Sequence, residues 1–238
     1  MKLQNRRHGE SLNERAQVLP FILKYNQMER GEYIFVGDDQ FIPSEFLSIP
    51  KRYVGFVDKI LVNNGLIVDR IHKIAQEINQ IYAGQHLVIL VLLKGAFRFA
   101  KDLTNSIDGF ENSVTYNLEF VRVKSYENDV QQEIRIQGLE NINVEGKHVL
   151  VVEDLVDSGN SLTKVKEILS GKGLASLRVS VLFYKRNPKN TLIVPELIGF
   201  SIPDEWIVGY GMDYNEAFRD FNHVGVLNEK GKEHYRIR

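Results

Sequence analysis

The chain has 238 residues, of which 43% are hydrophobic and 26% charged, as is typical of a globular protein with one sizeable core. A formal net charge of -1 provides no overall positive field, which argues against nucleic-acid binding or an anionic-membrane surface. The absence of cysteine excludes disulfides, thiolate metal sites and thiol nucleophiles. No segment approaches the roughly 18 apolar residues of a membrane span, and no signal peptide is evident, so we expect a cytoplasmic protein.

The first part of the chain differs in character from the rest. Residues 1 to about 40 are mostly polar and lack a sustained apolar period, so we expect a loosely attached extension there without catalytic residues. Residues 41–238 are expected to form a single domain. No internal repeat or low-complexity tract divides this region.

Regular elements are predicted from Gly65 onwards. Apolar residues at three- and four-residue steps between Leu66 and Ile81 predict an amphipathic helix. The continuous apolar run over 87–93 predicts a strand that is buried on both faces, as central parallel strands are. Partial alternation over 113–123 predicts another strand, and the polar stretch that follows it predicts a long loop.

The second half of the chain continues the same alternation. A second buried strand is predicted at 148–153, followed by a helix that begins near Ser161 and ends in a glycine-rich segment. Further strands are predicted at 177–185, 195–200, 205–210 and 222–227. Strands and helices in alternation indicate an α/β fold with a central parallel sheet and crossover helices.

The most informative segment is VLVVEDLVDSGNSLTKV, residues 149–165. A hydrophobic strand ends in Glu153 and Asp154, and residues 157–161 then turn into a helix. Small residues let backbone N–H groups surround a phosphate, and the helix N-terminus adds a positive dipole. Carboxylates beside a phosphate need a further partner, such as ribose hydroxyls, Mg²⁺ or a transferable proton, so the segment favours a sugar phosphate.

A simpler interpretation is that Asp157 and Ser158 only cap the helix that follows them. Capping does not account for Glu153 and Asp154 at the end of a buried strand.

The same segment resembles the phosphoribosyl-pyrophosphate motif of the type I phosphoribosyltransferases. In that motif a hydrophobic strand is followed by two acids, two apolar residues and then Asp, Ser or Thr, Gly and a closing hydroxyl residue. Asn160 stands where relatives commonly have Lys. The resemblance implies a central, mostly parallel sheet flanked by helices. It also implies a small hood subdomain over the carboxyl ends of the strands, contributed by segments near 41–60 and 186–238.

Two other segments resemble the hypoxanthine-guanine branch of this family. Leu93-Lys94-Gly95 is similar to its pyrophosphate loop, in which the Leu-Lys peptide can be cis, although Ala96 replaces a usual second glycine. The segment VRVKSYEND (121–129) is similar to the mobile loop of the branch, whose Ser-Tyr pair closes over the reacting centre and excludes water. That pair is Ser125 and Tyr126 here.

Segments 183–188 and 204–220 resemble the purine-binding half of such a site. Lys185 matches a lysine that donates to the exocyclic O6, Trp206 an aromatic residue that stacks on the base, and Ile207 a backbone contact to the purine edge. Asp213 matches a second Mg²⁺ ligand and Arg219 a pyrophosphate contact. Taken singly, Trp206 could belong to the core, Lys185 to a solvated strand end and Asp213 to a turn.

The resemblance implies transfer of the 5-phosphoribosyl group from phosphoribosyl pyrophosphate to N9 of hypoxanthine or guanine, with Mg²⁺ as cofactor and a homodimer or homotetramer as the assembly. The implied catalytic residues are Asp157, Lys94 and Arg219. The implied phosphoribosyl-pyrophosphate contacts are Lys94, Gly95, Ser125, Tyr126, Glu153, Asp154, Asp157, Ser158, Gly159, Asn160 and Ser161. Purine contacts are implied for Lys185, Trp206, Ile207 and Asp213, and metal ligation for Glu153, Asp154 and Asp213.

Other functions on the same fold remain open. A catalytically silent, nucleotide-binding paralogue or regulator is disfavoured by Asp157, because a carboxylate there is needed only for the chemistry. An RNA binder is disfavoured by the near-neutral charge. Specificity for adenine is disfavoured by Lys185, since an ammonium group only donates hydrogen bonds and adenine presents a donor at that position.

Overall fold

A computed structural model describes residues 33–236 of the chain, except 129–130, 189 and 191–192. The described residues belong to one compact unit, Glu32–Arg238. Its strands are β1 (Ile34–Phe35), β2 (Ile42–Pro43), β3 (Val57–Val62), β4 (His86–Leu93), β5 (Thr115–Asn128), β6 (Gln131–Gln137), β7 (His148–Val156), β8 (Ser176–Lys185), β9 (Leu197–Ile202), β10 (Ile207–Val208) and β11 (Val224–Leu227). Its α-helices are α2 (Asn64–Ile81), α3 (Phe97–Asp108), α4 (Asn160–Ser170) and α5 (Glu229–His234), and short 3-10 helices lie at Ser44–Phe46, Lys51–Tyr53 and Leu139–Asn141.

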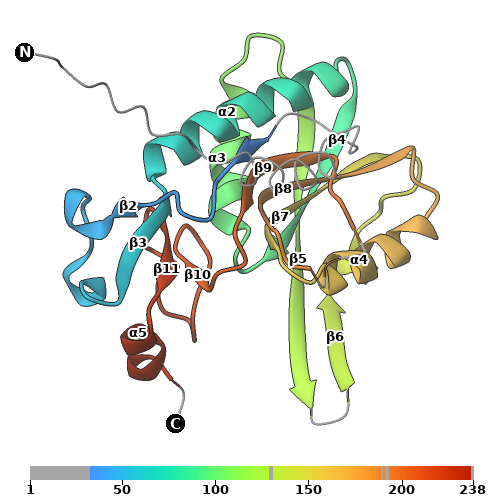
Figure 1. Ribbon diagram of the computed structural model, residues 1–238. Coiled ribbons are helices and arrows are strands. Elements are labelled where there is room, and N and C mark those ends of the chain that lie inside the picture. Colours follow the sequence, from blue (N-terminus) through green and yellow to red (C-terminus); the bar gives the residue numbers. More distant parts are fainter. Residues whose placement is uncertain (1–32, 129–130, 189, 191–192, 237–238) are drawn as a thin grey trace, which may run out of the picture. The chain divides into compact units, whose positions relative to one another are not determined.

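The strands form two sheets (Figure 1). The large sheet has the order β1-β9-β8-β7-β4-β5-β6, and every neighbouring pair in it is parallel except β5 and β6. The small sheet has the order β10-β11-β3-β2 and is antiparallel. This is the predicted mostly parallel α/β architecture, with the small sheet built from chain segments on either side of the central region.

The central strands are buried on both faces, as their continuous apolar sequences predict. Leu87, Ile89 and Val91 of β4 pack in one apolar cluster with α2 and α3, whereas the alternate residues of the strand pack in a second cluster with α4. Helices therefore cover both faces of the large sheet (Figure 1). The small sheet has its own apolar cluster around Tyr53 and Phe218.

Helix α2 begins where the sequence supplies a cap. The side chain of Asn63 accepts a hydrogen bond of 3.0 Å from the backbone N–H of Leu66, which satisfies one of the unpaired donors of the first turn. The apolar series after it faces the sheet, and none of the helices in the described residues has the length and apolar character needed to cross a membrane.

The prediction of a long loop after residue 123 was wrong. Strand β5 continues to Asn128, and β6 pairs with it antiparallel, from Arg122 opposite Gln137 onwards. A backbone ladder needs no apolar alternation when the strands lie at the edge of a sheet, so the polar sequence conceals the pairing.

Strand β1 lies within the segment expected to be an N-terminal extension, and it pairs parallel with β9 at the edge of the large sheet. Arg186 contacts this strand and the turn after it, because its guanidinium lies over the ring of Phe35 and is paired with Asp38. The extension as a whole stays a prediction, since residues 1–32 lie outside the described part of the chain.

The packing of α2 provides a test of the core assignment. Ile71 is fully buried, so Ile71→Ala should lower the free energy of unfolding by about 2–5 kcal/mol through lost burial and an unfilled cavity. Val68 on the same helix is 45% exposed, so Val68→Ala should change the free energy of unfolding by roughly 0.5 kcal/mol or less. Urea unfolding of both variants measures the difference, and equal losses would contradict this orientation of the helix.

Candidate functional site

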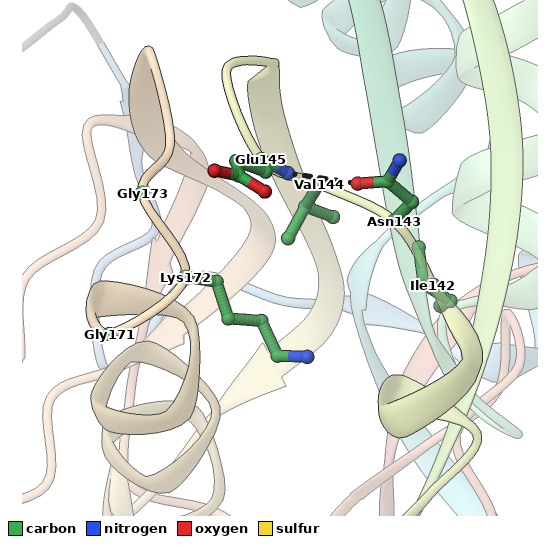
Figure 2. Close-up of a pocket in the computed structure, with 7 residues that line it drawn as sticks. All are labelled: Ile142, Asn143, Val144, Glu145, Gly171, Lys172 and Gly173. Carbon is green, nitrogen blue, oxygen red and sulfur yellow. Dashed lines mark hydrogen bonds between the residues drawn. The ribbon is translucent and has the colours of Figure 1, made fainter.

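Two cavities lie at opposite ends of β7. One of about 470 Å³ is lined by residues 142–145 and 171–173, which precede β7 and follow α4 (Figure 2). The other, of about 310 Å³, is lined by residues that include Asp154 and Asp157 at the carboxyl end of the same strand. Ligands of open α/β sheets bind at the carboxyl ends of the strands, so the smaller cavity is the candidate site.

Both sheets contribute to this cavity. The large sheet supplies Asp154, Leu155, Asp157 and Lys185, and the region of β10 supplies Trp206, Ile207, Met212 and Asp213. Trp206 is 53% exposed, so the interpretation of this residue as part of the core is wrong and its indole is accessible at the cavity. An aromatic side chain, an ammonium group and carboxylates thus line one small volume.

Asp157 contacts neighbouring donors and does not cap α4. Its Oδ2 accepts a hydrogen bond of 2.8 Å from Nζ of Lys185, and its Oδ1 accepts one of 2.6 Å from the side-chain amide of Asn187. Partial burial alone would raise the pKa of Asp157, but the hydrogen bonds from Lys185 and Asn187 outweigh it and lower the pKa. The N-cap position of α4 is occupied by Gly159, which has no side chain, so the helix-cap interpretation of Asp157 and Ser158 is also wrong.

The Lys185 side chain is only 9% exposed, which contradicts the interpretation of it as a solvated strand-end lysine. Its Nζ lies between two carboxylates, 2.8 Å from Asp157 and 3.8 Å from Asp204. A largely buried ammonium group needs such partners.

The segment predicted to bind a phosphate forms a loop between β7 and α4. Gly159 has a φ of +79°, a left-handed conformation that glycine adopts without strain, and α4 begins at the next residue, Asn160. Ser158 and Ser161 flank these two residues. The loop thus leads directly into the positive end of the helix dipole.

The acidic pair lies at the carboxyl end of β7. Burial raises the pKa of Glu153 well above its usual value, and the adjoining Asp154 carboxylate raises it further. Burial likewise raises the pKa of Asp154, although its hydrogen bonds and the charge of Arg219 act in the opposite direction. A cation at these groups would offset the cost of keeping both carboxylates ionised.

The donor set suits Mg²⁺, which prefers carboxylate oxygens and usually takes only one or two from the protein. Asp154 and Asp213 line the cavity, whereas Glu153 is not among its lining residues. In the part of the chain that the structure describes, no three His, Asp or Glu side chains gather into a preformed metal cluster. Such a site would need ligand oxygens to complete it.

Backbone contacts bring the end of β4 against both the acidic pair and the small sheet. A Cβ atom on Gly95 would overlap the carboxylate of Asp154, and one on Gly211, whose φ is +104°, would overlap the carbonyl oxygen of Gly95. The peptide between Leu93 and Lys94 is cis, as the resemblance implies. Glycine is therefore required at both contacts.

Lys94 and Arg219 come together through Glu216, a residue that the sequence analysis did not identify. Both carboxylate oxygens of Glu216 lie 2.9 Å from Nζ of Lys94, and Oε2 lies 3.4 Å from Nε of Arg219. Arg219 also pairs with Asp213 at 2.7 Å. Hydrogen bonds from Lys94 and then Arg219 lower the pKa of Glu216.

Most of the predicted residues therefore gather at one edge of the large sheet. The backbones of Ser125 and Tyr126 belong to β5, but their side chains lie outside the described part of the structure. Asn187 and Glu216 were missed. The sequence offered one signal for Asn187. It follows Lys185 by two positions, and side chains two positions apart along a strand point to the same face, although Asn187 lies beyond the end of β8.

An open, mostly parallel sheet, with a glycine-led helix N-terminus and acidic residues beside a cavity at its carboxyl edge, defines an α/β protein that binds phosphorylated small molecules. The sequence matches the Phosphoribosyl transferase domain over residues 58–215. The chain belongs to this family of phosphoribosyltransferases.

Individual relatives extend the match over most of the chain. It is similar to the hypoxanthine-guanine phosphoribosyltransferases of Sus scrofa, at 34% identity, and Homo sapiens, at 33%, each over 216 residues that cover 87% of this chain and 98% of the relative. Among solved structures it is similar to the hypoxanthine-guanine phosphoribosyltransferase of Schistosoma mansoni in complex with IMP. That likeness has a TM-score of 0.72 and 28% identity, and it covers 86% of this chain and 100% of the other. A hypoxanthine phosphoribosyltransferase from Staphylococcus aureus gives a TM-score of 0.71 at 28% identity, covering 80% and 100%.

The contact between Gly95 and Asp154 can be tested by substitution. Gly95→Ala should destabilise the protein by about 1–3 kcal/mol, because the added methyl group must displace the Asp154 carboxylate. Gly171 has φ -83° and an open surrounding, so Gly171→Ala is the matched control and should have little effect. Thermal unfolding measures both variants. An unchanged melting temperature in Gly95→Ala would show that residue 95 and the Asp154 carboxylate are not in contact.

Proposed function

We propose that this protein transfers the 5-phosphoribosyl group of phosphoribosyl pyrophosphate to N9 of hypoxanthine or guanine, yielding IMP or GMP and pyrophosphate. The observation that carries the proposal is the cavity in which Asp157, Lys185 and Trp206 meet at the carboxyl edge of the sheet, beside the phosphate loop. The relatives named above support the choice of purine. This chain spans almost the whole length of those relatives.

The phosphate loop and the basic residues suit the donor substrate. Backbone N–H groups of Ser158–Ser161 and the start of α4 would hold the 5-phosphate, and the carboxylates of Glu153 and Asp154 would bind the ribose hydroxyls. Lys94 and Arg219 would neutralise the pyrophosphate as the bond from its oxygen to the anomeric carbon breaks. Both cations already lie around one carboxylate, that of Glu216, in this structure.

Asp154 and Asp213 would hold Mg²⁺, with Glu153 as an additional or water-bridged contact. The metal would provide positive charge for the pyrophosphate oxygens. Two carboxylates at the cavity, one of them with a pKa raised mainly by burial, support this assignment.

The remaining cavity residues suit the purine. Trp206 would stack on the base, the backbone of Ile207 would contact its edge, and Lys185 would turn to donate to O6. As N9 forms its bond to the anomeric carbon, the proton leaves N7 for the carboxylate of Asp157. A lowered pKa keeps Asp157 ionised and ready to accept this proton.

The closing role of Ser125 and Tyr126 over the reacting centre, the assembly as a homodimer or homotetramer, and the cellular location stay predictions.

The activity is tested directly by measuring pyrophosphate release from phosphoribosyl pyrophosphate and Mg²⁺ with adenine, guanine, hypoxanthine or xanthine. Turnover is expected with guanine and hypoxanthine and not with adenine, because Lys185 can only donate. Chelation should abolish turnover and added Mg²⁺ should restore it. Absence of turnover with every purine would refute the proposed function, and turnover with adenine would refute the role of Lys185.

The stacking role of Trp206 makes a separate prediction. Trp206→Ala should raise the KM for the purine by the equivalent of about 1–3 kcal/mol, and Trp206→Phe should raise it less. Because the side chain is 53% exposed, neither variant should lower the melting temperature appreciably. Trp206 is the sole tryptophan, so purine binding with pyrophosphate and Mg²⁺ should also change the indole emission. Unchanged emission during turnover would exclude stacking.

A further inference from the structure

The carboxylate of Asp157 is held by both of its oxygens. Lys185 donates to Oδ2 at 2.8 Å from the end of β8, and Asn187 donates to Oδ1 at 2.6 Å from just beyond it. The Asp157 side chain is 47% exposed, and the residue lines the cavity. The two donors therefore fix an otherwise accessible group in one orientation.

The direction of the amide follows from the chemistry of the pair. An ionised carboxylate only accepts hydrogen bonds, and of the two polar atoms of an asparagine amide only the nitrogen donates. The atom of Asn187 that faces Asp157 is thus the nitrogen, and the bond is a charge-assisted one, which is stronger than a bond between neutral groups.

The two donors differ in what substrate binding requires of them. Lys185 lines the cavity with Asp157, and under the proposed function it turns towards the purine oxygen. Oδ2 then loses its donor and is free for the N7 proton. Asn187 is not among the residues that line the cavity and holds the other oxygen, so its bond need not break when the base enters.

We infer that Asn187 is a positioning residue for the transfer reaction, which holds Asp157 by Oδ1 while Oδ2 accepts the proton from the purine. The inference rests on the proposed function. Asn187 touches no reacting atom and acts through Asp157.

Among the described residues, the charged groups near Asp157 come from identifiable elements. Lys185 of β8 pairs with Asp157 directly, and Asp204, which precedes β10, faces Lys185 at 3.8 Å. Asp154 of β7 and Asp213 line the same cavity. Removal of the Asn187 donor leaves these charges unchanged, so any change in the titration of Asp157 would report the lost hydrogen bond.

Two substitutions of similar size separate hydrogen bonding from shape. Asn187→Leu removes the donor, and Asn187→Asp replaces it with a second carboxylate that must share a proton with Asp157. We expect kcat to fall roughly 10-fold or more in each, with the acid limb of its pH profile moved to higher pH and the KM for phosphoribosyl pyrophosphate nearly unchanged. Asn105 is exposed on α3, so Asn105→Asp is the matched control for added charge and should leave the profile unaltered.

A readout independent of turnover is the carbon-13 resonance of the Asp157 carboxyl in the full-length chain, assigned by its loss in Asp157→Asn. In Asn187→Leu its titration midpoint should move to higher pH. An unchanged midpoint, or equal losses in kcat and in affinity for both substrates, would overturn the inference. If the midpoint moves but the wild-type protein turns over no purine, the contact exists while the proposed function, and with it the catalytic meaning of Asn187, is refuted.

Discussion

The parallel pairing of β4, β7 and β8 determines where polar chemistry can occur in this protein. Each of these strands has apolar packing on both faces, so a charged side chain within them would be buried without water. The charged groups of the candidate site lie near the carboxyl ends of these strands: Glu153 and Asp154 in the last part of β7, Lys185 at the end of β8, and Lys94 directly after β4. Because the strands run in the same direction, these ends meet at one edge.

The small sheet adds the second half of the site through close backbone contact. Glycine at 95 and at 211 lets the end of β4 approach the loop after β10, and the Tyr210 hydroxyl donates to Asp102 of α3 at 2.5 Å. Arg98 of the same helix donates to the carbonyl oxygens of Arg219 and Phe221. These contacts hold the loop that carries Asp213 and Arg219 against α3 and the segment that follows β4.

Periodicity and motif were sufficient to predict the buried strands, α2, α4 and most residues that line the candidate cavity. Helix α3 was missed, although Phe99, Ala100, Leu103 and Ile107 have helical spacing and are buried, because it begins directly after the β4 loop without a side-chain cap. The β5–β6 hairpin was hidden because backbone pairing leaves no trace in a polar sequence. The partners of Asp157 and Lys94 depend on side chains 28 to 122 residues apart, which spacing alone does not reveal.

Any anion that binds Lys94 and Arg219 must first displace the carboxylate of Glu216. Lys94 and Arg219 are both paired with this carboxylate, which is 63% exposed and so is readily replaced by a competing anion. A chloride ion that displaced it would exchange one single charge for another and gain little. A polyphosphate carries several charges, so its interactions with Lys94 and Arg219 can offset the loss of the two ion pairs and still give a favourable binding free energy. Exposed ion pairs of this kind contribute only about 0–1 kcal/mol each, so a ligand with several phosphate charges can displace Glu216, whereas a monovalent anion would gain little binding energy from the exchange.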